Sequence, residues 1–221
     1  MSADRPRIAL IHATPVAIEP VVAAFAQAWP EAELANILDD SLTADRAKQK
    51  DLAPEMFPRF SRLARYAVDH GARGILFTCS AFGAAIDAAA REVAVPVLKP
   101  NEAMFDAALE RGGRIGMIAT FGPAMESMAA EFTEAAKRRN PPPALDAVLA
   151  DGAMEALRSG DIDAHNRKVA GAVGSLGNVD VIMLAHFSTA RALAAVQARV
   201  SVPVLTSPDA AVARLRACCS E

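Results

Sequence analysis

Short aliphatic runs alternate along the chain with longer alanine-rich segments whose apolar residues recur at helical spacing. The aliphatic runs are almost continuously apolar, which is typical of parallel strands covered by helices on both faces. The regular alternation of the two patterns indicates an α/β fold. The expected strands are 7–12, 32–38, 74–78, 96–98, 114–119, 144–149, 181–185 and 203–205, and the expected helices include 15–29, 55–70, 123–138 and 162–176.

Three strand segments of the first half recur in the second half at one constant offset in the numbering, because 114 − 7, 182 − 75 and 202 − 95 all equal 107. Such a constant offset predicts a duplication, with two pseudo-symmetric four-stranded parallel-sheet lobes, 1–105 and 106–221, facing one interlobe cleft. The C-terminal helix is free to pack back on the first lobe. The matched segments are RIALI at 7–11 with RIGMI at 114–118, ILF at 75–77 with IML at 182–184, and VPVL at 95–98 with VPVL at 202–205.

Composition and charge narrow the classes of partner. Apolar residues make up 52% of the chain and charged residues 22%, which describes a folded protein and not a disordered one. The formal net charge of −3 makes nucleic acid an unexpected partner. No charge-free apolar stretch reaches the length of about 20 residues that a membrane-spanning helix needs. Three cysteines make a poor disulfide framework, so we expect a cytoplasmic protein, and alanine-rich helices leave a homo-oligomer open.

Cys79 follows the third strand directly, and the constant offset places His186 at the matching position of the second lobe. Ligands of parallel sheets gather beyond the carboxyl ends of the strands, so both residues are expected in the cleft. A following helix would lower the pKa of the Cys79 thiol, and the hydroxyls of Thr78 and Ser80 suit an oxyanion. The imidazole of His186 suits proton transfer. The alternatives are a small buried thiol and a structural histidine.

Polar residues after the other strands are further candidates for substrate binding. His12 and Thr14 follow the first strand, where a helix cap or a strand-end hydrogen bond is the alternative. No metal-ligand spacing and no glycine-rich phosphate loop is present, so neither a metal nor a nucleotide cofactor is expected. After the remaining strands the candidates are Asn36 and Asp40, with Asp39 and Ser41 beside them as ligands or loop caps, and Thr120, Phe121, Phe187 and Ser188.

With these features the chain resembles the aspartate/glutamate racemase superfamily, which includes hydantoin racemases, maleate isomerases and arylmalonate decarboxylases. The resemblance covers most of the chain. It implies two lobes, chemistry without a cofactor, and a small carboxylate or carbonyl substrate held between the lobes. It rests on the duplicated unit and on three segments, FTCSAFG around Cys79, NILDDSL at 36–42 and VPVLKPNEAM at 95–104.

The resemblance also implies roles for the two strand-end residues. Racemases of this family place one cysteine in each lobe, and here Cys79 matches the first while His186, within LAHFSTA, stands in place of the second. The expected activity is therefore that of an isomerase of the racemase type, with Cys79 as base or nucleophile and His186 as the opposing acid or base. A lyase, isomerase or decarboxylase that uses Cys79 alone, and a catalytically silent protein that binds a small dicarboxylate, remain as alternatives.

Overall fold

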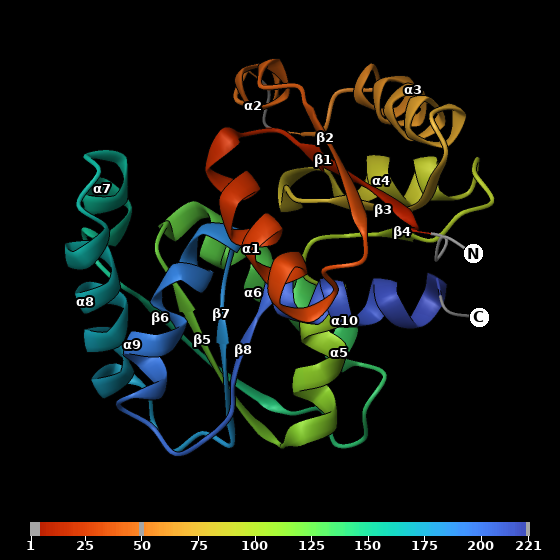
Figure 1. Ribbon diagram of the computed structural model, residues 1–221. Helices are drawn as coiled ribbons and strands as arrows, with labels where there is room; N and C mark the ends of the chain where they lie inside the picture. The colour runs from red at the N-terminus through yellow and green to blue at the C-terminus, as the bar shows by residue number, and fades with distance from the viewer. Residues whose placement is uncertain (1–4, 49–50, 220–221) are drawn as a thin grey trace. The chain divides into compact units, whose positions relative to one another are not determined.

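The computed structural model describes residues 5–48 and 51–219, which form two compact units. The first unit extends to Glu102 and takes in the C-terminal segment from Ala211, and the second spans Ala103–Ala210. Each unit holds one four-stranded parallel sheet flanked by helices (Figure 1). The predicted α/β fold with a duplicated four-stranded unit is therefore confirmed.

The first sheet has the strand order β2-β1-β3-β4. One face is covered by α3 and α4, because apolar residues of both helices share a buried cluster with the β1 and β3 side chains that point to this face. The elements of this unit are β1 (Arg7–His12), α1 (Ile18–Ala28), β2 (Glu33–Leu38), α2 (Ser41–Arg46), α3 (Met56–Asp69), β3 (Ala72–Phe77), α4 (Gly83–Ala90) and β4 (Val97–Leu98).

Helix α10 (Ser207–Cys219) begins in the second unit and ends in the first. The guanidinium of its Arg216 donates to the carbonyl of Ala28 at 2.6 Å, and the thiol of Cys219 contacts the carbonyl of Arg73. The last turns of this helix are therefore part of the first unit.

The second sheet repeats this topology with the order β6-β5-β7-β8. Apolar side chains of α5 and α6 cover one face of β5 and β7, and those of α7, α8 and α9 cover the other. The elements are α5 (Glu102–Arg111), β5 (Arg114–Ala119), α6 (Gly122–Ala136), β6 (Ala144–Leu149), α7 (Ala153–Arg158), α8 (Ile162–Ala172), β7 (Val181–Leu184), α9 (Leu193–Gln197) and β8 (Val204–Thr206).

The strand register carries the same repeat as the sequence. Ile75 of β3 pairs with Val97 of β4, and Ile182 of β7 pairs with Val204 of β8, so 182 − 75 and 204 − 97 give the same offset of 107. The outer strands β2 and β6 have a larger offset, because their first residues are Glu33 and Ala144 and 144 − 33 is 111. The segment between β5 and β6 is therefore longer than the segment between β1 and β2. At β7 the offset is 107 again, because Ile182 matches Ile75.

Several predicted boundaries differ from the structure. Strand β3 begins at Ala72, earlier than predicted, because its first residues pair with β1 through an irregular register at Arg7 that apolar content does not signal. The predicted helix 15–29 opens as a 3₁₀ turn over Pro15–Ala17 before α1. The predicted helix 162–176 ends at Ala172 and continues as a 3₁₀ turn, consistent with the low helix propensity of the glycines there.

None of the helices in the described part of the chain combines the length and the apolar character that crossing a membrane requires. Within the same residues, no group of three or more His, Cys, Asp or Glu side chains is arranged to hold a metal ion.

Candidate active site

A hydrogen-bonded chain joins three neighbouring strands of the first unit near their carboxyl ends, with His12 and Thr78 buried and Asn36 exposed. The imidazole of His12, at the end of β1, lies 3.0 Å through Nε2 from Oδ1 of Asn36 on β2 and 2.9 Å through Nδ1 from the hydroxyl of Thr78 after β3. Because the amide oxygen only accepts, Nε2 carries the proton and Nδ1 accepts from Thr78. Burial lowers the pKa of His12, against the opposing hydrogen bond to Asn36, so the imidazole is neutral. The structure thus places all three residues in a strand-end hydrogen-bond network.

Cys79 directly follows Thr78 of this network, just beyond the end of β3. It has an extended backbone and precedes a single 3₁₀ turn, Ser80–Phe82, which leads into α4. Burial raises the pKa of its thiol, and a hydrogen bond from the backbone of Ala81 opposes this effect without overcoming it. The predicted lowering of the thiol pKa is therefore wrong, because desolvation outweighs the one backbone dipole that reaches the sulfur. The resting group is a neutral thiol.

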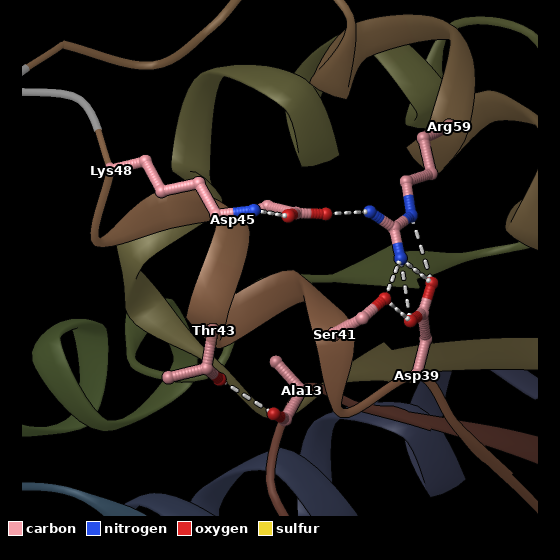
Figure 2. A network of polar contacts seen from close by, with 7 residues as sticks. All are labelled: Ala13, Asp39, Ser41, Thr43, Asp45, Lys48 and Arg59. Atoms are coloured by element: carbon pink, nitrogen blue, oxygen red, sulfur yellow. Dashed lines mark hydrogen bonds and ion pairs between the residues drawn. The ribbon is translucent and has the colours of Figure 1, made fainter.

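The other first-unit candidates lie at the same sheet edge in less enclosed positions. Thr14 and Ser80 are half-buried, and Thr14 makes no side-chain cap although it precedes a helical turn. Asp40 is exposed at the start of α2 and likewise makes no capping hydrogen bond. Asp39 and Ser41 are held by Arg59 of α3 in a polar network drawn in Figure 2. Thr14, Asp40 and Ser80 are accordingly the first-unit candidates whose side chains lie outside these two polar networks.

The corresponding strand ends of the second unit are apolar where those of the first are polar. Ala119 and Ala185 occupy the places of His12 and Thr78, and the backbone of Ala185 donates to the carbonyl of Ile118 at 2.9 Å. Thr120 follows β5 as a buried residue, and Phe121 next to it is exposed. Phe187 and Ser188 are buried in the 3₁₀ segment that follows β7. The two halves share a backbone plan and differ in the chemistry of their strand ends.

His186 has an unusual backbone and an unusual environment. Its φ is 73° with ψ 150°, a region that side-chain-bearing residues rarely adopt and that costs on the order of 1–3 kcal/mol. Both ring nitrogens are buried and have no hydrogen-bond partner among the described residues. Burial lowers the pKa of His186 to about 4, so the imidazole is neutral at pH 7. Orphaned buried polar atoms at a strained residue are typical of functional sites.

Two further hydroxyls share this situation. The Oγ1 atoms of Thr120 and Thr189 are buried and, within the described part of the chain, lack a partner. Thr120 follows β5 and His186 follows β7, and these strands are paired at Ile118 and Leu184, so both residues lie at one edge of the sheet. Thr189 was missed by the sequence analysis, although it belongs to the same LAHFSTA segment as His186. The edge therefore holds neutral groups with unused capacity for hydrogen bonds, as a binding site for a polar small molecule requires.

The fold and these strand-end residues define a two-unit α/β protein of duplicated topology, with polar and ionisable side chains beyond the carboxyl ends of strands in both sheets. Residues 38–178, more than half of the chain, match the family described as Asp/Glu/Hydantoin racemase. This chain belongs to that family. No protein among the curated sequences matches it.

Solved structures of similar fold cover nearly the whole chain. A glutamate racemase from Francisella tularensis, in complex with D-glutamate, has 14% identity and a TM-score of 0.72, covering 97% of this chain and 80% of that one. An aspartate racemase homologue from Pyrococcus horikoshii has 18% identity and a TM-score of 0.69, covering 97% and 99%. The allantoin racemase from Klebsiella pneumoniae has 19% identity and a TM-score of 0.68, covering 96% and 86%. These likenesses confirm the duplicated racemase fold.

Proposed function

We propose that this chain is a cofactor-independent racemase or isomerase of a small carboxylate-bearing substrate, with Cys79 and His186 acting on opposite faces of one carbon. The observation that supports the proposal most directly is His186. It stands where the repeat places a counterpart of Cys79, it holds a strained backbone, and its ring nitrogens are buried without partners among the described residues. A substrate that supplies hydrogen bonds and a transferable proton would give the two buried ring nitrogens the partners that they lack.

The resting protonation states set the direction of proton transfer. Burial favours the neutral form of both groups, so the thiol of Cys79 holds a proton and the imidazole of His186 has a nitrogen free to take one. In one direction the imidazole removes the α-proton and the thiol gives its proton to the opposite face of the carbanion. The products are an imidazolium and a thiolate, from which the reverse reaction starts. A bound carboxylate favours the imidazolium and thereby strengthens the base when substrate is present.

The hydroxyls at the two sheet edges would hold the substrate. Thr14 and Ser80 in the first unit, with Thr120 and Ser188 in the second, are the proposed contacts for carboxylate or carbonyl oxygens. We do not place the network of His12, Asn36 and Thr78 in direct contact with the substrate, because these side chains already hydrogen-bond to one another.

Exchange of the α-proton with solvent tests the proposal. The protein is incubated in D₂O with each enantiomer of glutamate and aspartate and with allantoin, and deuterium uptake is followed by NMR beside optical rotation. We expect uptake and loss of rotation for one of these compounds, or for a related compound with a hydrogen α to a carboxylate or carbonyl group. Both C79S and H186N should lower the rate by at least about 10²-fold, the range that one acid–base group contributes. C218S, at an exposed thiol, is the matched control and should keep full activity.

The alternatives give different results in the same assay. Retained turnover in H186N, with a mass adduct on Cys79, would favour the enzyme that uses a single cysteine. Tight binding of a small dicarboxylate with no exchange over long incubation would favour the silent binding protein. Full activity in C79S would contradict both cysteine mechanisms.

A further inference from the structure

Helix α2 contacts both strand-end turns of the first unit. The hydroxyl of Thr43 donates to the carbonyl of Ala13, directly after β1, at 2.6 Å (Figure 2). At the end of the helix, Nε of Arg46 donates to the carbonyl of Ala81, in the turn that follows Cys79, at 3.4 Å. Leu42 anchors the helix, because it is buried in the same apolar cluster that Cys79 packs against. One short helix thus links the β1 turn to the Cys79 turn.

Arg59 of α3 fastens this helix in place. Its guanidinium binds Asp39 through Nε at 2.8 Å and through Nη2 at 2.6 Å, and it binds Asp45 through Nη1 at 2.8 Å. Asp39 precedes α2 and Asp45 lies within it near its last residue, so the single side chain of Arg59 binds both ends of this segment (Figure 2). Lys48 holds the remaining oxygen of Asp45 at 2.8 Å. A two-pronged guanidinium–carboxylate contact of this kind has strict geometry, which a lysine cannot reproduce.

The electrostatics of the clamp agree with its geometry. The hydrogen bond with Asp39 raises the pKa of Arg59, against a smaller opposing effect of burial. Burial alone would raise the pKa of Asp39, but hydrogen bonds from Arg59 and Ser41 hold it below its usual value. Both side chains of the pair are only 23% exposed, so water screens the contact less than it would on an open surface.

The second unit shows that the repeated fold does not depend on this clamp. Helix α7 follows β6 as α2 follows β2, and it packs on α8 as α2 is held to α3. In the second unit, the neighbouring helix α8 contributes Lys168, whose Nζ donates to the carbonyl of Asp151 at 3.3 Å. The same topology therefore forms with a different polar contact, and the clamp that Arg59 makes with Asp39 and Asp45 occurs in the unit that contains Cys79.

We propose that Arg59 is a positioning residue that locks α2 across the β1 turn and the Cys79 turn, and so fixes the Cys79 thiol against the backbone of Ala81. The lock acts through Thr43 and Arg46, which carry its restraint to the two turns. Without Arg59 the helix would loosen at both ends, and the Cys79 turn would open toward solvent. This inference rests on the proposed function only in treating Cys79 as the reacting group.

The test measures Cys79 directly and needs no substrate. Full-length wild-type protein, R59M, T43V and the R59M/T43V double variant are treated with iodoacetamide, and modification of the Cys79 peptide is followed by mass spectrometry. We expect R59M and T43V each to speed modification by about tenfold, and the double variant by clearly less than the product of the two, because both release the same helix. R62M removes an exposed arginine from α3 and should leave the rate unchanged.

Low urea separates local opening from general loss of stability. If R59M acts by releasing α2, its modification rate should respond weakly to urea below the unfolding transition, since little surface is exposed. A steep response matching global unfolding would overturn the proposal, as would a wild-type rate in R59M or rates that simply multiply in the double variant. If R59M does not fold, T43V and R59K carry the same comparison. Failure of the exchange assay with the expected modification pattern would contradict the proposed function alone.

Discussion

Cys79 and His186 each lie two residues beyond the end of an inner strand, β3 ending at Phe77 and β7 ending at Leu184. The inner strands of the two sheets are paired in the same register, because Ala9 lies beside Ile75 and Gly116 beside Ile182, so the two residues occupy equivalent points of the repeated unit. Their backbones nevertheless differ, because Cys79 is extended with φ −123° while His186 has φ 73°. The two repeats therefore keep these residues at the same position but differ in residue type and in backbone conformation.

This divergence makes the two proposed proton carriers unequal. Two cysteines would be chemically equivalent, so either could act as the acid or as the base. A thiol and an imidazole differ in proton affinity, so the one proton that they share resides mainly on one of the two groups. Burial of both groups favours thiol with imidazole over thiolate with imidazolium. The two directions of the proposed reaction therefore start from enzyme forms of different population.

The first prediction concerns the network beneath Cys79. T78V removes the hydroxyl that donates to Nδ1 of His12 while keeping the side-chain volume, so a buried nitrogen loses its partner. We expect the free energy of unfolding to fall by about 1–3 kcal/mol in urea titrations. T78S keeps the hydroxyl and should lose less, and T133V, at an exposed threonine of α6, should change stability by less than about 0.5 kcal/mol. Equal stability of T78V and wild type would show that His12 finds another partner.

The second prediction concerns the protonation of Cys79. Because burial raises the pKa of this thiol above its ordinary value of 9.0, little thiolate is present at pH 7. The rate of modification by iodoacetamide, measured on the Cys79 peptide, should still be rising at pH 9. A plateau reached below pH 8 would mean that the thiolate is stabilised, and would favour a nucleophilic role over that of a proton donor.

Much of the fold was predictable because the signals were local and repeated. Residues 7–11 and 114–118 carry nearly the same aliphatic run, and an offset that recurs in three strands leaves little freedom in topology. The same offset led to Cys79 and His186 as equivalent positions. Their roles as catalytic groups stay predictions, because a repeat fixes where a residue lies and not what it does.

Other features depend on contacts that sequence does not encode locally. The pKa of Cys79 was predicted from a helix that follows it, but the sulfur meets one backbone N–H and an apolar cluster, so burial decides the direction. The clamp between Asp39 and Arg59 joins residues 20 positions apart on different elements. The φ of His186 had no signal in the sequence, since glycine is the usual residue in this region of φ and ψ.

The third prediction is a pH dependence of stability that His186 carries. Its pKa is lowered from 6.5 to about 4 in the folded protein, so the unfolded chain binds a proton first as the pH falls. The folded state is therefore favoured above pH 6.5, and this advantage is lost progressively between pH 6.5 and about 4. At pH 5 the loss amounts to about 2 kcal/mol from this group. His12 and His165, whose pKa values burial also lowers, act in the same direction.

Comparison with H186N isolates that contribution. Urea unfolding at pH 7.5 and pH 5 should show a smaller drop for H186N than for wild type, by about 2 kcal/mol. The other histidines are present in both proteins and cancel. An identical drop in the two proteins would mean that His186 is not desolvated in the native state.

The fourth prediction uses the backbone of His186. Glycine usually destabilises a folded position relative to alanine, by about 0.5–1 kcal/mol in regular structure, but at positive φ it relieves strain that alanine keeps. H186G should therefore be more stable than H186A by about 1 kcal/mol, although both lose the imidazole and leave the same cavity apart from one methyl group. At Cys79, whose φ is −123°, the order should reverse, with C79A more stable than C79G. Thermal and urea unfolding of the four variants measures both differences. If H186G were less stable than H186A, the strain at His186 would be absent in solution, and the proposed function would lose one of its three supports.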